Sequence, residues 1–309
     1  MRTGARWALA LAAVVVVTVA AVVIWFTRHP LQVFEAAQRR ALERAGFERV
    51  ELGAGGERMV LFSAGRGPAL LFLHGLGDQA GTWSKVAPAF LADHRVVAVD
   101  LPGHGESEPL GGDLTMATLM AGAERALVFA ANDGPVTVVG NSLGAWLATL
   151  LAQRHPEQVG RLVLVNGGAL AGEPGGPSLA PKNRSDAAEL MRLLRDPGAR
   201  PLPGYVLDDV VRRAANGPIA RLSRDLPGMV AHLLDGRLGE VATPTELVWG
   251  ESDRLIPLAY AERLRAALPA VRLTRVERCG HVPQIECPER FTALLVARLA
   301  AAPPAAPAP

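Results

Sequence analysis

The chain of 309 residues has few cysteines, few lysines and little net charge. Its two cysteines, Cys279 and Cys287, are too few for a disulfide framework or a structural zinc site. Buried free thiols are the simpler expectation, and one disulfide is the alternative if the domain is exported. The formal net charge of +2 is dispersed and forms no basic stripe, so nucleic acid is not an expected partner.

Only one uncharged run is long and apolar enough to cross a membrane, at residues 7–26, between Arg6 and Arg28. An uncleaved anchor is the favoured interpretation and a cleaved signal peptide is the alternative. Signal peptides have an apolar region of roughly 7–15 residues that ends in a small-x-small site, whereas this run ends in Val-Val-Ile-Trp-Phe. Arg2 and Arg6 favour a single pass through the inner membrane, with the domain facing the periplasm or the cell exterior.

Short apolar runs that suit buried strands alternate with helical patterns along the chain. Residues 47–52 and 58–63 are strand-like and are joined by four small residues at 53–56, which predicts a hairpin. Further strands are expected at 69–73, 95–99, 136–139, 162–165, 246–249 and 271–276. Helices are expected at 31–46, 115–132, 143–154, 259–268 and 288–299, with another after residue 78 that carries Trp83. This alternation predicts a mostly parallel, doubly wound α/β sheet.

Between residues 169 and 243 the alternation stops. This segment has Gly- and Pro-rich loops and helical stretches at 185–195, 207–216 and 219–234, but no strand pattern. We therefore expect a helical cap inserted into the sheet domain. The predicted organisation is an anchor at 1–30, the sheet domain at 31–168 and 244–299, the cap at 169–243 and a disordered Ala/Pro tail at 300–309.

The most informative motif is Gly140-Asn-Ser-Leu-Gly144, which follows an apolar strand and leads straight into a helix. Such an abrupt turn forces Ser142 into a strained conformation, and the two glycines leave room for the turn. The helix N-terminus behind it favours developing negative charge. A G-x-S-x-G run arises by chance in a chain with 32 glycines, so the strand and helix around it carry the argument. They predict that Ser142 is a catalytic nucleophile.

Two further polar residues, Asp253 and His281, each follow a predicted strand. The carboxyl ends of parallel strands lie at one edge of a sheet, so these residues can meet Ser142 there. His281 would accept the Ser142 proton and return it to the leaving group, and Asp253 would orient the imidazole. The backbone N–H groups of Leu76 and Leu143 are the expected oxyanion donors.

The remaining acids and histidines fit these roles less well. Glu251 follows the same strand as Asp253 and is its one competitor, whereas Glu277 and Glu286 are expected on the surface. The histidines that suit structural roles or lack a strand-end setting are His29, His94, His104, His155 and His232.

Five motifs follow one another along the chain: His74-Gly-Leu-Gly, Asp100-Leu-Pro-Gly-His-Gly-Glu-Ser, Gly140-Asn-Ser-Leu-Gly, Gly250-Glu-Ser-Asp-Arg and Gly280-His281. On these motifs the chain, from about residue 47 to 299, resembles the α/β-hydrolase fold family. It looks most like bacterial membrane-anchored lipases and esterases of the monoacylglycerol-lipase type. The resemblance implies a carboxylic ester hydrolase with a Ser-His-Asp triad, an acyl-enzyme intermediate and no metal or organic cofactor. One departure is Ala145-Trp146 after the motif, where a second glycine is common.

Three other functions are weighed against this interpretation. Carbon–carbon bond hydrolases of aromatic breakdown are similar in the Asn-Ser pair and in a Gly-Gly-Pro-Ser run at 175–178, but usually carry Trp after the catalytic His, where this chain has Val282. Haloalkane dehalogenases have Asp at the nucleophile position, which Ser142 disfavours. A non-catalytic ligand-binding protein on the same scaffold is a third possibility, because fold alone does not prove activity.

The insertion is rich in apolar residues at helical spacings. Many of these must pack the cap itself, yet a cap over a parallel sheet usually leaves an apolar cleft. Trp83, Trp146, Met191 and Met229 are the expected lining residues. The expected substrates are neutral esters of apolar acyl groups, such as glycerides or similar lipids, and the sequence gives no oligomeric state.

Overall fold

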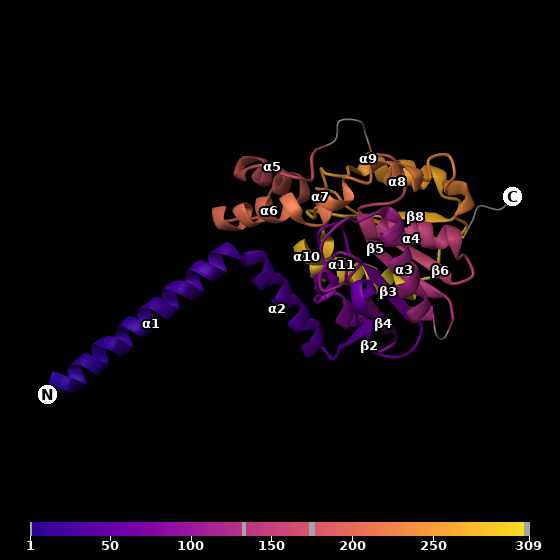
Figure 1. The fold of residues 1–309 in the computed structure, drawn as a ribbon. Coiled ribbons are helices and arrows are strands. Elements are labelled where there is room, and N and C mark those ends of the chain that lie inside the picture. Colours follow the sequence, from indigo (N-terminus) through magenta and orange to yellow (C-terminus); the bar gives the residue numbers. More distant parts are fainter. Residues whose placement is uncertain (1, 132–133, 173–176, 306–309) are drawn as a thin grey trace.

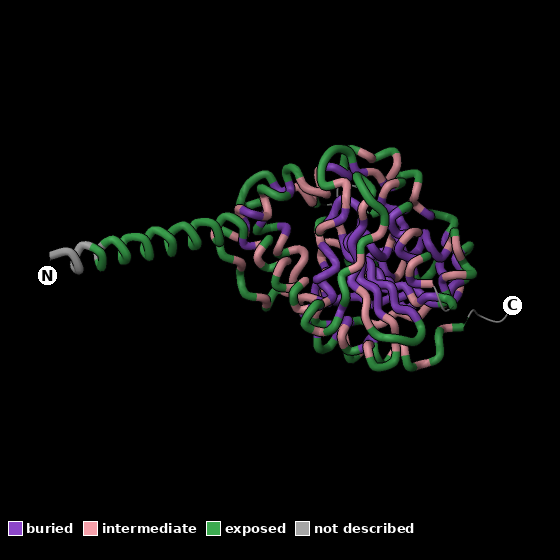
Figure 2. The backbone as a smooth tube through the Cα atoms, turned by 60° about the horizontal axis from the view of Figure 1, so that its bottom comes forward, coloured by how far each residue is buried: buried purple, intermediate pink, exposed green. Residues whose placement is uncertain are grey.

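The computed structural model describes residues 2–131, 134–172 and 177–305, and it holds one long helix outside an α/β domain (Figure 1). This helix, α1 (Arg2–Arg28), leads into α2 (Pro30–Arg44), which packs on the domain. The stretch Ala10–Arg28 has a mean hydropathy of 2.6 and none of it is buried (Figure 2). Its length and composition fit either a membrane span or a signal sequence.

In the described part of the chain, eight strands form one sheet in the order β1-β2-β4-β3-β5-β6-β7-β8. The first two strands pair antiparallel, β2 pairs antiparallel with β4, and all later neighbours are parallel. The strands are β1 (Glu48–Leu52), β2 (Met59–Ala64), β3 (Ala69–Leu73), β4 (Arg95–Val99), β5 (Val136–Asn141), β6 (Val159–Val165), β7 (Thr245–Gly250) and β8 (Val271–Val276). The predicted hairpin and mostly parallel α/β sheet are therefore confirmed.

Both faces of the sheet are buried, because the central strands are apolar on both sides. In β3, Leu71 and Leu73 join one buried cluster, and Leu70 and Phe72 join the other. This alternation follows from the two-residue period of a strand. The helices that follow the strands are α3 (Met116–Ala130), α4 (Leu143–Arg154), α9 (Leu258–Ala267), α10 (Pro283–Glu286) and α11 (Pro288–Ala300).

The helix expected after residue 78 is replaced by two short 3-10 turns, η2 (Ala80–Trp83) and η3 (Ala87–Phe90). Gly81 approaches the backbone of α2 so closely that a Cβ there would lie 2.9 Å from the Arg39 nitrogen. Pro88 lies in the first turn of η3. The sequence pattern predicted one continuous helix here. The close packing and the proline interrupt it, and the segment forms two short turns instead.

The insertion carries only helices and loops in its described residues. The helices are α5 (Arg184–Leu194), α6 (Gly204–Asn216), α7 (Pro218–Leu222) and α8 (Leu226–Ala231), followed by the short 3-10 helix η5 (Leu238–Glu240). The single helix expected at 219–234 is two short ones, because Pro227 cannot continue a helix and starts α8 instead. The boundaries at 169 and 243 remain proposals from the sequence. Residues 175 and 176 of the Gly-Gly-Pro-Ser run lie outside the described residues.

Helix α2 is bound both to the insertion and to the turn after β3. The Glu35 carboxylate pairs with the Arg213 guanidinium of α6. In the contact with the turn after β3, the Gln79 side chain donates to the side chain of Gln38 in α2 (2.9 Å). At the α1 end, the Phe26 and Tyr205 rings lie 6.2 Å apart. Thus α1, α2 and α6 meet in one place (Figure 1).

The Ala/Pro tail begins in an ordered state. Residue 300 ends α11, and the Ala301 carbonyl accepts a hydrogen bond from Arg161 (3.2 Å). Residues 306–309 lie outside the described part of the chain.

Candidate active site

Ser142 occupies a sharp turn between β5 and α4. Its backbone has φ 55° and ψ −115°, a left-handed conformation that is unfavourable for a residue with a side chain. The turn is possible because the glycines on either side lack a Cβ. A Cβ at Gly140 would lie 2.2 Å from the Gly144 carbonyl oxygen, and one at Gly144 would lie 2.2 Å from the Leu73 carbonyl oxygen. The predicted strand–turn–helix geometry is therefore present.

Loops from the two neighbouring strands pack against Ser142. The Ser142 N–H donates to the Val165 carbonyl at the end of β6 (2.9 Å). A Cβ at Gly167 would lie 2.6 Å from the Ser142 Cα, and one at Gly75 would lie 3.3 Å from the Ser142 Cβ. The ends of β3 and β6 thus enclose the serine, which is half-buried.

Asp253 and His281 form a buried pair in the loops after β7 and β8. The His281 Nδ1 lies 2.7 Å from the Asp253 Oδ2. The other carboxylate oxygen, Oδ1, accepts the backbone N–H groups of Leu255 and Ile256, each at 2.9 Å. Asn166 donates to Oδ2 (2.6 Å), so the carboxylate has four partners and a fixed orientation.

Hydrogen bonds connect this pair to the residue that precedes Ser142. Asn141, which precedes the serine, donates through Nδ2 to the His281 carbonyl (3.0 Å). Gln284 in turn donates to the Asn141 Oδ1 (3.1 Å). Asp253 and His281 are thus in contact, and the His281 backbone is bonded to the residue that precedes Ser142.

The competing acids have other surroundings. Glu251 is exposed, while Asp253 is only 3 % exposed and contacts the histidine. Glu286, which the sequence placed on the surface, is half-buried and accepts the Gly280 N–H (2.5 Å) and the Asp196 N–H (2.8 Å). The expectation for Glu286 is wrong, because α10 turns its side chain back toward the His281 loop.

The site includes amides that the sequence analysis missed. Asn166, Asn141 and Gln284 are buried and hold the acid and the base loop. A signal was present for Asn166, because it directly follows the strand β6 at the same sheet edge as the predicted residues. No comparable signal marks Gln284, whose contact depends on the turn into α10.

The backbone N–H groups of Leu76 and Leu143, the expected oxyanion donors, belong to the residues that follow Gly75 and Ser142. Leu143 is the first residue of α4, and Leu76 follows Gly75 in the turn after β3. Among the backbone hydrogen bonds of the described residues, none uses either N–H group. Ile219 of α7 covers this turn, since a Cβ at Gly77 would lie 3.2 Å from its Cδ1.

The turn after β3 is held by neutral histidines. The Leu101 N–H donates to the His74 Nε2 (3.0 Å), so Nδ1 carries the proton and donates to the Gly75 carbonyl (2.7 Å). Burial and the neighbouring His104 hold the pKa of His74 well below its usual range. Burial also lowers the pKa of His104 to about 4. Both imidazoles are therefore structural and uncharged at neutral pH.

A buried acid, Asp100, and a half-buried acid, Asp78, lie in the same region. Burial raises the pKa of Asp100 to about 6, although its carboxylate accepts the backbone N–H groups of Ala80 (2.7 Å) and Glu106 (2.8 Å). Burial also raises the pKa of Asp78 to about 7. Asp100 thus binds the loop after β4 to the turn after β3.

The four expected lining residues have different positions. Trp83 is 0 % exposed and packs between Phe72 and Phe291, so it is a core residue and cannot line a cleft. Trp146 is half-buried and donates through Nε1 to the His232 carbonyl (2.9 Å), which connects α4 to the insertion. Met191 in α5 and Met229 in α8 are both half-buried.

Two surface hollows, of about 470 and 600 Å³, lie away from Ser142. The first is formed by α4 and the end of the insertion, including Gln153 and Arg237, and the second lies near β1 and β4, including Gly46 and Arg95. The apolar cleft over Ser142 therefore stays a prediction. Among the described residues, no group of three or more His, Cys, Asp or Glu side chains is arranged to hold a metal ion.

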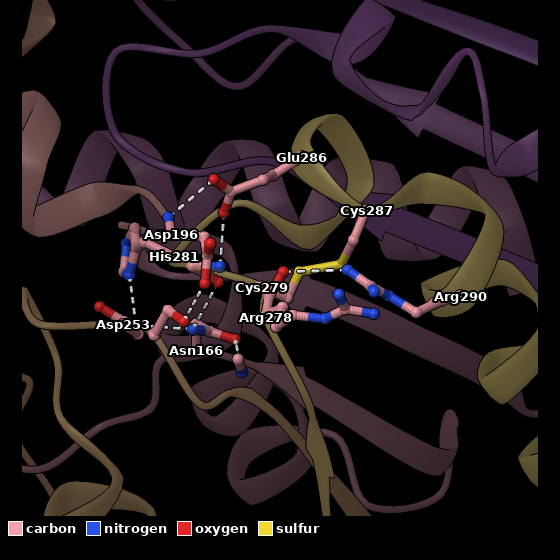
Figure 3. The surroundings of a disulfide bond; sticks show 12 residues. Asn166, Asp196, Asp253, Arg278, Cys279, His281, Glu286, Cys287 and Arg290 are labelled. Carbon is pink, nitrogen blue, oxygen red and sulfur yellow. Dashed lines mark hydrogen bonds and ion pairs between the residues drawn. A yellow bond between two sulfur atoms is a disulfide. The ribbon is translucent and has the colours of Figure 1, made fainter. Parts of the chain in front are cut away.

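Cys279 and Cys287 form a disulfide, with Cα atoms 5.9 Å apart (Figure 3). The expectation of free thiols is therefore wrong. The bond closes the segment that carries His281, because α10 folds Cys287 back beside the end of β8. Figure 3 shows His281, Asp253 and Glu286 on one side of this bond.

Comparison with known proteins agrees with this architecture. The chain is 31% identical over 272 residues to an uncharacterised protein of Mycobacterium tuberculosis, covering 76% of each chain. It is 30% identical to a 2-hydroxy-6-oxononadienedioate/2-hydroxy-6-oxononatrienedioate hydrolase of Paraburkholderia xenovorans, covering 82% of this chain and 94% of that one.

A solved membrane phospholipase A, described as a bacterial virulence factor, is similar over 94% of this chain and 96% of its own, with a TM-score of 0.73 and 25% identity. A putative lipase from Acinetobacter baumannii has the same fold, with a TM-score of 0.73 and 24% identity over 86% of this chain and 95% of that one. The sequence model of the alpha/beta hydrolase family matches residues 70–294. With the strand order and the Ser142 turn described above, this match shows that the chain belongs to the alpha/beta hydrolase family.

Proposed function

We propose that the protein is a serine hydrolase that cleaves carboxylic esters of apolar acyl groups through an acyl-enzyme intermediate. Ser142 is the nucleophile, His281 is the general base and then the general acid, and Asp253 orients and stabilises the imidazole. The Ser142 Oγ attacks the ester carbonyl while its proton moves to the His281 Nε2. His281 returns that proton to the departing alkoxide, and water then releases the acyl group by the reverse sequence of transfers.

The observation that carries this proposal is the buried Asp253–His281 contact of 2.7 Å. Asp253 accepts at the His281 Nδ1, so the imidazole carries its proton there and leaves Nε2 free to accept one. Asn141 attaches the His281 backbone directly beside Ser142. A base of fixed tautomer next to a strained serine is what nucleophilic acyl transfer requires.

The geometry also supports an oxyanion site at Leu76 and Leu143. Their N–H groups have no partner among the described backbone hydrogen bonds, and Leu143 begins a helix whose N-terminus favours negative charge. The loop that carries Leu76 packs closely against α4: a Cβ at Gly144 would lie only 2.7 Å from the His74 carbonyl oxygen. Two such donors stabilise the oxyanion of a tetrahedral intermediate.

An apolar acyl group is favoured by the insertion and by the relatives. Met191 and Met229 are half-buried in the cap, and Trp146 joins the cap to α4 beside the nucleophile. The membrane phospholipase A and the putative lipase share the fold over most of the chain. We propose neutral glycerides or similar lipids as the substrate class.

Labelling with a fluorophosphonate tests the proposed nucleophile in the full-length protein in detergent. We expect labelling and ester hydrolysis in the parent protein, and loss of both by several orders of magnitude in Ser142→Ala and His281→Ala. Ser223→Ala is the matched control, because Ser223 is an exposed serine of the insertion that donates only to the nearby Ala220 carbonyl. Hydrolysis above a few per cent in Ser142→Ala would contradict the assignment.

A second candidate is the hydrolysis of carbon–carbon bonds, which the relative in Paraburkholderia xenovorans favours. The substrates named for that enzyme carry two carboxylates and need cationic partners. Arg221, in α7 beside the loop after β4, instead donates to the carbonyls of Pro109, Gly111 and Gly112 (2.7–3.0 Å). Comparing turnover of a 2-hydroxy-6-oxo-dienoate with that of a p-nitrophenyl ester decides between the two, and faster turnover of the dienoate would favour the second candidate.

The proposed location is the inner membrane, with α1 as a single span and the catalytic domain in the periplasm or outside the cell. The Cys279–Cys287 disulfide supports this side, because disulfides form and persist in oxidising compartments. The mean hydropathy of Ala10–Arg28 supports the span.

A further inference from the structure

A short segment of the insertion lies between the loop of the acid and the loop of the base. It consists of residues 193–196, the last two residues of α5 and the two that follow it, and is called the strap here. The Leu193 carbonyl accepts the Arg254 N–H (3.0 Å), and the Leu194 carbonyl accepts the His281 N–H (2.7 Å). The strap thus binds the residue after Asp253 and the base itself.

The strap fits closely against the base loop. A Cβ at Gly280 would lie 2.2 Å from the Leu194 carbonyl oxygen and 2.9 Å from the Arg195 Cα. Only a glycine therefore allows this approach. His281 follows Gly280, so a displacement of the strap would displace Gly280 and with it the catalytic imidazole.

Glu286 links the strap to the base loop a second time. One of its carboxylate oxygens accepts the Gly280 N–H (2.5 Å), and the other accepts the Asp196 N–H (2.8 Å) (Figure 3). A carboxylate that accepts two N–H groups in a half-buried position forms strong, charge-assisted hydrogen bonds. Glu286 therefore holds residues 196 and 280 at a fixed separation.

Asp196 extends the connection to the acid loop. Its side chain accepts the hydroxyl of Ser252 (2.5 Å), which is next to Asp253, and the N–H of Gly198 (2.8 Å). The Ser252 hydrogen bond is the largest cause of the lowered pKa of Asp196, so this carboxylate is ionised at neutral pH. Ser252, Asp196, Glu286 and Gly280 thus form a continuous path from one catalytic loop to the other.

The disulfide makes the base loop a closed ring. Cys279 and Cys287 flank Gly280, His281 and Glu286, so all three residues lie inside the ring. The ring limits how far the loop deforms internally, but it does not fix the loop relative to Asp253 or Ser142. That relation depends on contacts with other segments, of which the strap provides several.

From these contacts we infer that Glu286 and Asp196 are positioning residues that hold the His281 loop in register with the Asp253 loop. This inference rests on the proposed function of His281 as the base. Removing the Glu286 carboxylate leaves the Gly280 and Asp196 N–H groups without their acceptor, and the loop must move to find others. A displacement of about 1 Å between reacting groups costs about 100-fold in rate.

The test compares substitutions in the full-length protein in detergent. We measure kcat and KM for p-nitrophenyl butyrate, the rate constant of fluorophosphonate labelling and the melting temperature, with kcat expressed per labelled molecule. Glu286→Ala should lower both kcat and the labelling rate by about 10- to 100-fold, with KM within twofold. Glu286→Gln keeps one acceptor oxygen and presents a donor to the second N–H, so it should lose less than Glu286→Ala.

Two further variants complete the comparison. Ser252→Ala removes the link to the acid loop and should lower kcat several-fold with KM unchanged. Glu289→Gln is the matched control, because Glu289 is an exposed acid at the start of α11, and it should leave every quantity unchanged. If Glu286→Ala does not fold, Glu286→Gln and Ser252→Ala carry the test.

The outcomes separate this inference from the proposed function. If kcat per labelled molecule stays within twofold in the Glu286 and Ser252 variants while the melting temperature falls, these residues only stabilise the fold and the inference is wrong. If Ser142→Ala hydrolyses esters as well as the parent does, the proposed function is wrong, whatever the Glu286 variants show. Loss of kcat in the variants together with an inactive Ser142→Ala supports both.

Discussion

Replacing Asp253 with Asn is the most direct test of how the acid acts, because the side chain keeps its shape and loses its charge. The Asp253 Oδ1 accepts two backbone N–H groups, and Oδ2 faces Asn166 and the His281 Nδ1. An Asn side chain has one acceptor oxygen and one donor nitrogen. It therefore cannot satisfy both sets of donors.

The two orientations of the amide have different costs. With the nitrogen toward Leu255 and Ile256, two partly buried backbone donors lose their acceptor, at up to about 1–3 kcal/mol each. With the nitrogen toward His281, those bonds survive, but the imidazole must present Nδ1 as an acceptor. Its proton then moves to Nε2, which can no longer accept the proton of Ser142. We expect the second orientation, and with it the wrong tautomer.

The expected loss in kcat is about 10⁴-fold, as in the Ser-His-Asp triads of other folds. This corresponds to about 5.5 kcal/mol of activation free energy. The assay is steady-state hydrolysis of p-nitrophenyl butyrate by the parent, Asp253→Asn and Glu251→Gln, with circular dichroism to establish folding. Glu251 is exposed, so its variant should keep nearly full activity. A folded Asp253→Asn that loses less than about 10-fold, or a Glu251→Gln that loses as much, would refute this reasoning.

Three further predictions concern stability, substrate and location. Replacing both Cys279 and Cys287 with Ser opens a ring whose ends are 8 residues apart in sequence, and should lower the free energy of unfolding in urea by about 2.6 kcal/mol. Equal stability with and without excess reductant would mean that the cysteines do not pair. For p-nitrophenyl esters, kcat/KM should rise from acetate to octanoate, since each buried methylene contributes roughly 0.8 kcal/mol and four give about two orders of magnitude. A steady fall from acetate onward would contradict an apolar acyl site. The full-length protein should stay in the membrane fraction after an alkaline wash, whereas a mature N-terminus beyond residue 26 would identify a cleaved signal peptide.

The sequence predicts the centre of the sheet well because the strands β3 to β7 are short, mostly apolar runs that are buried on both faces. The strand expected at 69–73 coincides with β3, and the one at 95–99 coincides with β4. It predicts less of the region after β3, where Gly81 packs against α2 and 3-10 turns replace a helix. That outcome depends on a contact between segments about 40 residues apart, which periodicity does not report.

In the candidate site too, some residues could be predicted from the sequence and others could not. Ser142, Asp253 and His281 share a local signature, a polar residue in a turn after a predicted strand. The roles of Glu286 and Asp196 have no such signature, because they depend on how the insertion returns to the sheet. The disulfide was not the favoured expectation for a related reason. Its cysteines are 8 residues apart in sequence, a separation that allows both a disulfide and two free thiols, and they approach each other only because α10 turns the chain back.

The contacts of α2 give the protein a fixed orientation relative to its anchor. The Glu35–Arg213 pair attaches α2 to the insertion, and the Gln38–Gln79 hydrogen bond attaches it to the turn after β3. With α1 in a membrane, as proposed, the domain cannot turn freely above the lipids. The enzyme then encounters ester lipids in two dimensions, and its rate should follow their mole fraction in the bilayer instead of their concentration in the solution. Diluting proteoliposomes in buffer should leave the rate per enzyme unchanged, while diluting the ester lipid with an inert lipid should lower it.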